Sequence, residues 1–261
     1  MDQDAIRSYW VQQARAHGRS HAASWSDLRV IELEVAEIAR RLTEGDRVLD
    51  VGCANGFSSL QLARAHAIVL RGLDFVPEMI KNARANLNAV RSVLRGDVIF
   101  EVGDILSLEE ADGAYDKVIV TRVLINLESW DRQVRALGEC ARVLRSGGTL
   151  MLSEATVQGW TRLNRLRAEW GLPDIPMPAF NTYLDEDALL GAAAPYFDVL
   201  ETVNFASTYY VGTRVLKPIL AKALNSDIDV ADPAAEWNRW WASLPAWGDY
   251  GTQKLFVLRR R

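Results

Sequence analysis

Long hydrophobic runs and cysteines are both scarce in this sequence of 261 residues. No apolar run approaches the roughly 20 residues that a membrane-spanning helix needs, so we expect no membrane partner. The two cysteines, Cys53 and Cys140, lie far apart and lack metal-ligand spacing, so neither a disulfide framework nor a metal site is expected. The first ten residues, MDQDAIRSYW, lack the basic and apolar regions of a secretory signal. These absences favour a reduced, cytoplasmic protein.

An excess of positive charge is also missing. The formal net charge is −4 and the isoelectric point is near 5.5, so no global field gathers DNA or RNA. The basic cluster Arg259 to Arg261 is interpreted as a solvated tail. We therefore expect no nucleic-acid partner.

Segments of strand length and of helix length alternate through the first 155 residues. Apolar residues at helical spacing predict an amphipathic helix over residues 27–43, with Asp27 as its N-cap. Further helices are expected after Gly56, in PEMIKNARANLNAV, and from near Ser129 to Gly147-Gly148. Strands are expected at RVLDV, IVLRGLD, VIFEVGD, YDKVIVT, TLMLSEA, FDVLETVNF and TQKLFVLRR. This alternation predicts an α/β fold with a doubly wound, mostly parallel seven-stranded sheet.

The domain organisation expected from these elements is one domain with additions. Residues 1–27 form an N-terminal lid segment, and residues 28–261 form the main domain. Two insertions, near residues 157–182 and 205–249, interrupt the alternation and are rich in tryptophan or proline.

The stretch VLDVGCANGFSS, residues 48–59, predicts a cofactor site. A strand, a glycine-rich turn and a helix let a ligand lie against the main chain and the free N–H groups of the helix. Dinucleotide sites use the spacing G-x-G-x-x-G, but position 57 is not glycine here. Asp50, two residues before Gly52, would repel phosphates, so the ligand is expected to be cationic.

Two more acids stand at the ends of the next two strands. Asp74 follows Gly52 by about twenty residues, where a carboxylate accepts hydrogen bonds from ribose hydroxyls. Asp104 ends the third strand, where it could accept one from an adenine amino group. A nucleoside with a cationic tail and no phosphates describes S-adenosylmethionine, which is the expected cofactor.

These motifs resemble those of the class I S-adenosylmethionine-dependent methyltransferases. The resemblance covers residues 28–155 and rests on VLDVGCANG, Asp74-Phe75, GDI, YDKVIVTRVLINL and RVLRSGGTLMLSE. It implies a Rossmann-like fold with a helical lid and helical insertions. One departure is Ala54, where the family has glycine; alanine fits this turn if its φ is negative.

The resemblance also implies roles for individual residues. The methionine portion is expected to lie against the turn beside Asp50, with the adenine against Phe75 and near the Ile105 backbone. Thr121 and Arg122 are expected to line the methionine end and the path to the acceptor. The full set of expected cofactor-binding residues is Asp50, Gly52, Cys53, Ala54, Gly56, Asp74, Phe75, Asp104, Ile105, Thr121 and Arg122.

A hydroxyl acceptor needs a base within hydrogen-bond reach, and three residues are candidates. His17 and His21 are four residues apart, on one face of a helix if this segment is helical. They are surface histidines, a base, or a metal pair, although no carboxylate nearby completes a metal site. Glu154 ends the fifth strand at the ligand edge of the sheet. It acts as a base or is hydrogen-bonded to neighbouring backbone.

The insertions supply aromatic residues that could surround an acceptor. The alternative interpretation is that EWNRWWASLPAW packs its tryptophans into a subsidiary core. The candidate substrate-binding residues are Trp160, Tyr209, Tyr210, Arg214 and Tyr250.

Together these observations predict an enzyme that methylates a small molecule. The favoured acceptor is a hydroxyl of a natural product or sugar. An amine N-methyltransferase and a non-catalytic S-adenosylmethionine-binding protein are the alternatives. The acceptor's identity and the oligomeric state, including a homodimer, stay open.

Overall fold

A computed structural model describes residues 3–224 and 232–261. Within these ranges seven strands form one sheet in the order β3-β2-β1-β4-β5-β7-β6. The strands are β1 Arg47–Val51, β2 Val69–Asp74, β3 Asp97–Val102, β4 Tyr115–Thr121, β5 Leu144–Ala155, β6 Phe197–Val203 and β7 Gln253–Arg260. β7 is antiparallel to β5 and β6, and the other neighbouring strands are parallel. The predicted mostly parallel, seven-stranded sheet is confirmed.

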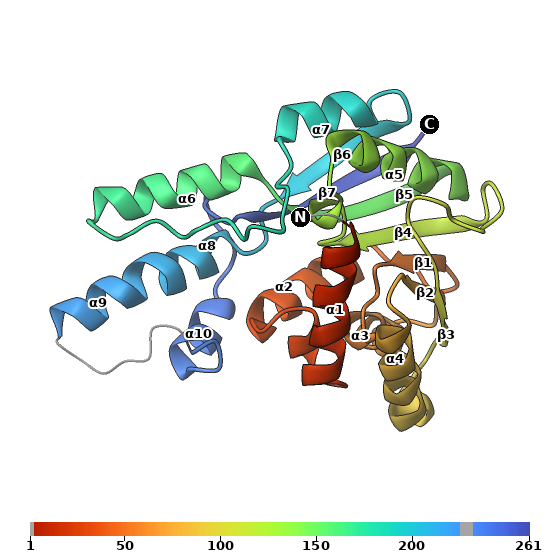
Figure 1. Ribbon diagram of the computed structural model, residues 1–261, viewed down its shortest axis with the longest axis horizontal. Coiled ribbons are helices and arrows are strands. Elements are labelled where there is room, and N and C mark those ends of the chain that lie inside the picture. The colour runs from red at the N-terminus through yellow and green to blue at the C-terminus, as the bar shows by residue number, and fades with distance from the viewer. Residues whose placement is uncertain (1–2, 225–231) are drawn as a thin grey trace.

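Helices cover both faces of this sheet (Figure 1). The helices are α1 Gln3–His17, α2 Leu28–Ala39, α3 Phe57–Ala65, α4 Pro77–Val90, α5 Trp130–Val143, α6 Val157–Glu169, α7 Glu186–Ala193, α8 Ser207–Tyr210, α9 Lys217–Ala223 and α10 Glu236–Ala242. Single turns are η1 His21–Ala23, η2 Arg91–Val93 and η3 Leu124–Asn126, and a π-helical segment, η4, spans Val211–Leu216. α2, α3 and α4 bury their apolar sides in one core cluster, and α5 and α7 bury theirs in a second. A sheet covered on both faces explains why its parallel strands are almost wholly apolar.

Local sequence sets most of these boundaries. The Asp27 carboxylate accepts a hydrogen bond from the Val30 N–H and caps α2, as predicted. The predicted extension of α5 to Gly147-Gly148 is wrong. The helix ends at Val143, because Leu144 is extended and pairs with Tyr115 of β4.

His17 and His21 do not share one helix face, because the segment between them is not a continuous helix. α1 ends at His17, and Gly18 turns the chain with a φ of +52°. Ser20 then caps the separate turn η1, which starts at His21. A left-handed glycine is a common helix terminator, and it breaks the i, i+4 relation here.

The two insertions form an arm beside the sheet. α6 and α9 extend away from the sheet in Figure 1. The tryptophans of α10 pack on one another, and the Trp237 indole N–H donates to the Gly212 carbonyl. Residues 225–231 of the second insertion lie outside the described residues.

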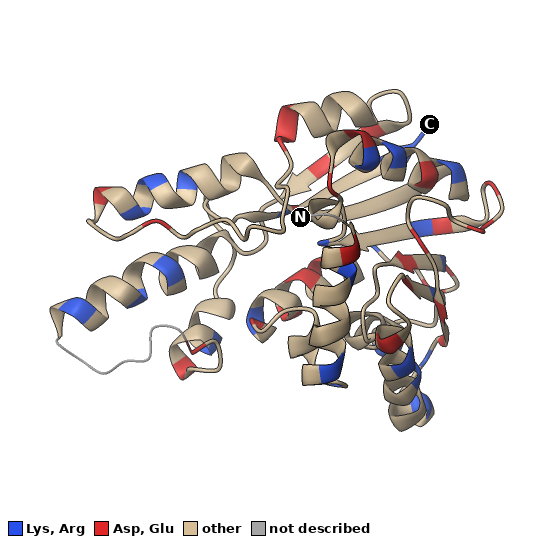
Figure 2. Ribbon diagram, viewed as in Figure 1, with Lys and Arg blue, Asp and Glu red and all other residues tan. Residues whose placement is uncertain are grey.

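Acidic and basic side chains are interspersed along the same helices, as Figure 2 shows for α4 and α5. Among the described residues, no helix has the length and apolar character to cross a membrane. In the same part of the chain, no group of three or more His, Cys, Asp or Glu could hold a metal ion.

Candidate functional site

The glycine-rich turn after β1 is held against the end of β2. The N–H groups of Gly52 and Cys53 both donate to the Leu73 carbonyl, at 2.7 and 2.9 Å. Gly52 has a φ of +80°, and a Cβ there would lie 2.1 Å from a methyl of Val123. Glycine is therefore required both by the positive φ and by the close approach of Val123. Without a side chain, the backbone of Gly52 also lines the cleft directly.

A cleft lies over this turn, and Asp50 is buried at its base. The Ser59 hydroxyl donates to one carboxylate oxygen at 2.5 Å, whereas the other oxygen, Oδ1, is buried with no hydrogen-bond partner within the described residues. Burial raises the pKa of Asp50 to about 6, against the opposing effect of the Ser59 hydrogen bond. A buried carboxylate oxygen without a donor is costly, so it favours a ligand that brings a cationic donor.

Asp74 ties the turn to the end of β2. Its two oxygens accept from the Ala54 and Val76 N–H groups, both at 2.9 Å. Burial raises the pKa of Asp74 to about 6, although both hydrogen bonds act in the other direction. Each carboxylate oxygen keeps a second lone pair, so Asp74 can still accept from ligand hydroxyls.

Ala54 does not have the negative φ that would let alanine fit this turn without strain. Its φ is +48°, in the left-handed region, where a residue with a Cβ pays about 1–2 kcal/mol. The hydrogen bond from its N–H to the buried Asp74 carboxylate holds it in this conformation. Alanine is tolerated because this contact offsets the strain.

A second cleft continues the first toward β3. Asp104 and Ile105 line it, together with Gly103 and Leu127. Gly52, Phe75, Val123 and Asn126 line both clefts, so the two are continuous. All the expected cofactor residues except Gly56 line this double cleft. Gly56 instead starts α3 with a φ of +75°, close against the Phe100 ring.

The double cleft fits S-adenosylmethionine. Its deep end offers the unpartnered oxygen of Asp50, which matches an ammonium group. Asp74 and Phe75 follow, and Asp104 lies at the far end. Asp50 and Asp74 are both acidic and would repel an anionic pyrophosphate, so the cleft disfavours a dinucleotide.

Arg122 stands where the cofactor cleft opens into a further cavity. It has a φ of +56°, and its guanidinium pairs with the buried carboxylate of Glu34 and lies 4.9 Å from the Trp25 ring. The Ser153 hydroxyl also donates to Glu34, at 2.6 Å. These contacts hold the guanidinium in one place, although its backbone is strained.

This further cavity is the better candidate for the acceptor site. It shares Trp10, Ser24, Arg122 and Asn126 with the first cleft. α1 forms one wall of this cavity. The segment that precedes α7 and the segment that precedes β7 form others. The remaining lining includes Tyr9, Gln13, His17, Trp25, Ile125, Ala155, Pro178, Phe180, Asn181, Tyr183, Thr252 and Gln253.

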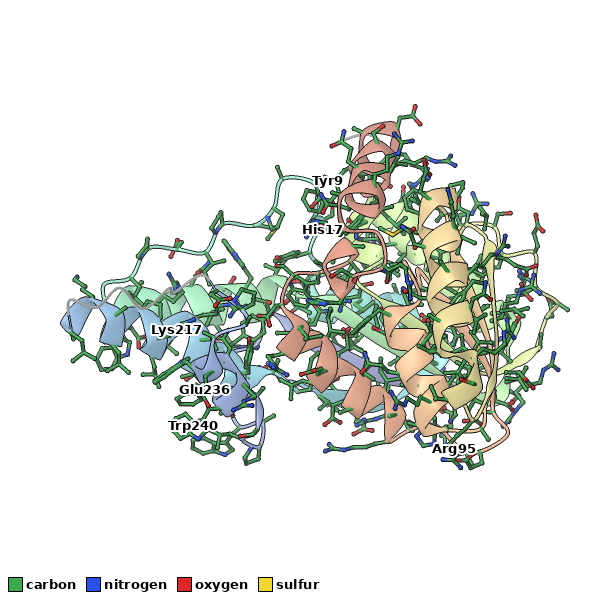
Figure 3. All side chains as sticks on the ribbon, turned by 90° about the horizontal axis from the view of Figure 1, so that it is seen from below. Tyr9, His17, Arg95, Lys217, Glu236 and Trp240 are labelled. Atoms are coloured by element: carbon green, nitrogen blue, oxygen red, sulfur yellow. The ribbon has the colours of Figure 1, made fainter. Side chains whose placement is uncertain are left out.

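Of the two histidines, only His17 lines this cavity. Tyr9, Gln13 and His17 follow one another at intervals of four, on one side of α1, and Figure 3 shows Tyr9 and His17 on that side. His21 instead packs against the Phe57 ring, with centroids 5.6 Å apart.

Glu154 is held by backbone rather than placed in a cavity. It is completely buried, and its oxygens accept from the N–H groups of Val123, Leu124 and Ile125, at 2.8, 2.7 and 3.4 Å. Burial raises the pKa of Glu154 to about 8, because it outweighs these three hydrogen bonds. We therefore assign Glu154 to positioning the turn after β4, not to proton transfer.

None of the expected substrate-binding residues lines these three cavities, although Tyr210 contacts Thr252 of the acceptor lining. Tyr209 and Arg214 both contact the carboxylate of Asp27, and Tyr210 bonds to Thr252. The Trp160 indole N–H donates to the Ile175 carbonyl. Tyr250 is 37 % exposed beside the arm. Tyr209 and Tyr210 are buried and Arg214 is partly exposed. The contacts of Tyr209 and Arg214 with Asp27 anchor the arm to the start of α2.

Sequence reasoning named His17 and Arg122 but missed most of the other residues that build the acceptor cavity. Asn126 follows β4 by five residues, and Phe180 and Asn181 lie in an irregular segment with no periodic signal. Glu34 did carry a signal: it lies on the apolar face of α2, between Ile31 and Ile38. A carboxylate on a buried helix face needs a partner, and here the partner is Arg122.

Comparison with known proteins gives a consistent assignment. The family model described as "Methyltransferase domain" matches residues 42–171. Methyltransferase GfsG of Streptomyces halstedii is 32% identical over 150 residues, which are 53% of this chain and 51% of that protein. The 27-O-demethylrifamycin SV methyltransferase of Amycolatopsis mediterranei is 32% identical over 113 residues, 43% of this chain and 40% of that protein. The chain spans about half the length of the curated relatives it matches.

A solved structure matches over the full length. The magnesium protoporphyrin IX methyltransferase of Synechocystis PCC 6803, solved with bound SAH, has a TM-score of 0.64 and 17% identity, and the match covers 100% of both chains. At this identity the likeness shows the shared fold.

Proposed function

Since the chain belongs to the class I S-adenosylmethionine-dependent methyltransferases, we propose that it transfers a methyl group from this cofactor to a hydroxyl group of a small molecule. The observation that carries the proposal is the continuity of two sites. A cleft suited to the cofactor opens beside Arg122 into a separate cavity that His17 lines.

The cofactor supplies a methyl group that is already activated by its sulfonium. The chain therefore has to align the acceptor with that methyl group and keep water out, and alignment alone contributes about 7–11 kcal/mol. The acceptor oxygen forms the new O–CH₃ bond as the S–CH₃ bond breaks and its electron pair stays on sulfur. His17 takes the hydroxyl proton in this proposal.

An amine acceptor is the second candidate. A protonated amine would be attracted by a carboxylate, but no Asp or Glu belongs to the described lining of the acceptor cavity. The cavity therefore favours a hydroxyl. A non-catalytic cofactor-binding protein would have no use for such a cavity next to the methyl position.

The first prediction tests the cofactor site and the activity together. Asp74→Ala should weaken S-adenosylmethionine binding at least tenfold in calorimetry, because it removes the carboxylate assigned to the ribose. The matched control is Asp97→Ala, an exposed aspartate at the opposite end of β3, which should bind normally.

The same proteins should then be given methyl-labelled cofactor and a small-molecule extract. Wild type and Asp97→Ala should move label into a low-mass compound as an O-methyl group. Unchanged binding by Asp74→Ala contradicts the cofactor assignment, and tight binding without any labelled product supports the non-catalytic alternative.

A further inference from the structure

The acceptor cavity has aromatic walls from two distant parts of the chain. The Tyr9 and Phe180 rings lie 4.6 Å apart with a tilt of 31°, and Trp10 meets Phe180 edge-on at 6.4 Å. Tyr183 and Trp25 add further rings to the lining. Flat apolar faces of this kind suit a ring-bearing ligand.

The cavity is also nearly free of net charge. Arg122 is the one Lys or Arg in its described lining, and Glu34 already neutralises it. Gln13, Ser24, Asn126, Asn181, Thr252 and Gln253 supply neutral polar groups. A charged ligand would lose its hydration here without gaining an opposite charge, so the lining selects an uncharged one.

Two amide oxygens in this lining lack hydrogen-bond partners among the described residues. The Asn126 amide nitrogen donates to the Arg122 carbonyl at 2.7 Å, which fixes the orientation of the amide and leaves Oδ1 buried with no hydrogen bond. The Oδ1 of Asn181 is likewise buried with no partner in the described part of the chain. Both oxygens accept hydrogen bonds and cannot donate them.

The two asparagines are carried by segments that are bonded to each other. The Thr182 N–H donates to the Ile125 carbonyl at 2.7 Å. The buried Gln133 amide donates to the carbonyls of Leu124 and Thr182, at 2.9 and 3.0 Å. The two segments that carry these amides are therefore fixed relative to each other before any ligand arrives, which favours recognition by the pair.

Resting on the proposed function, we propose that Asn126 and Asn181 select the acceptor: an uncharged ring compound that carries, beside the hydroxyl that is methylated, a second hydroxyl that donates to one of these amide oxygens. A ligand that lacks a donor leaves a buried oxygen unpaired. Loss of the second hydroxyl should therefore lower kcat/KM by about tenfold or more.

The test uses four probes on one scaffold, with labelled S-adenosylmethionine at saturation. They are a naphthalene with two adjacent hydroxyls, naphthol, a hydroxynaphthoate, and a hydroxynaphthyl trimethylammonium. The dihydroxy probe should be methylated with a kcat/KM at least tenfold above naphthol. The anionic and cationic probes should be weaker than naphthol.

Variants then separate recognition from folding. Asn181→Ala should raise KM for the dihydroxy probe about tenfold and bring its kcat/KM close to that of naphthol, while cofactor binding stays within twofold. Asn181→Asp should shift the preference toward the cationic probe. Asn88→Ala, an exposed asparagine on α4, should behave as wild type.

The failures are distinguishable. Failure of the wild-type protein to bind S-adenosylmethionine would overturn the proposed function. Normal cofactor binding with no methylation of any hydroxyl probe, equal use of a charged probe, or an unchanged preference in Asn181→Ala would overturn the acceptor class alone.

Discussion

At the scale of single residues, His17 differs from His21 in where it lies. His17 is the last residue of α1 and lines the acceptor cavity, whereas the His21 ring packs against the Phe57 ring. Their sequence spacing suggested equivalent roles, but Gly18 separates them into two elements. Only His17 lines the proposed acceptor cavity.

His17→Ala should therefore lower kcat by about a hundredfold to ten-thousandfold, the usual contribution of a general base. His21→Ala should change kcat by less than about tenfold. Steady-state kinetics across a pH range measures both, and cofactor affinity should be the same in each variant. Equal losses in the two variants would refute the assignment.

At the scale of elements, the junction of β5 with the turn η3 depends on Glu154. Three N–H groups of that turn converge on one buried carboxyl group. The pKa of this group is raised to about 8 by burial, from an ordinary value of 4.5. Its contribution to stability is thus present below pH 4.5 and is lost as the pH rises through about 8.

The free energy of unfolding should consequently fall by about 1–2 kcal/mol between pH 6 and pH 8 because of this one group. Glu154→Gln cannot titrate, so its urea unfolding should lack that part of the fall. Glu169→Gln, at an exposed position on α6, should retain it. A wild-type pH profile that matches Glu154→Gln would show that Glu154 stays ionised.

The elements were the most predictable part of this protein. The strands of the sheet and α4 follow directly from the length and periodicity of their apolar residues. Asp27 caps α2 as expected, and α5 starts next to Ser129 as expected. The position of the cofactor cleft was also predictable from the sequence, because Asp50, Asp74 and Asp104 belong to one edge of a parallel sheet.

The acceptor cavity was not predictable in the same way. It joins α1 to residues 178–183 and to the start of β7, and no local pattern encodes such a meeting. The aromatic residues of the second insertion misled the interpretation, because Tyr209 and Tyr210 are buried in the core cluster that α2, α3 and α4 share.

At the scale of the whole molecule, Asn55 fastens the N-terminal segment to the cofactor turn. Its buried amide nitrogen donates to the carbonyls of Gly18 and Ser20, at 3.0 and 2.7 Å. Asn86 of α4 in turn donates to the Asn55 carbonyl. The proposed lid, residues 1–27, is attached at the same turn that supports the cofactor.

Asn55→Ala should therefore cost about 1–3 kcal/mol of stability, since two carbonyls lose their donor. Hydrogen exchange in residues 3–24 should accelerate more than exchange in β1 or β4. Cofactor affinity should also fall, because Trp10 and Ser24 line the first cleft. Uniform acceleration throughout the sheet would mean that the segment is not a separate unit.

The helix α1 touches every compartment of the site at once. Ile6 borders the adenine end of the double cleft, Tyr9 borders the acceptor cavity, and Trp10 borders both the methionine end and that cavity. The helix α1 is therefore in contact with both binding sites. If the first molecule to bind orders this helix, the second molecule binds without that cost in free energy. Thermodynamic linkage makes the effect mutual: the factor by which the cofactor tightens acceptor binding equals the factor by which the acceptor tightens cofactor binding.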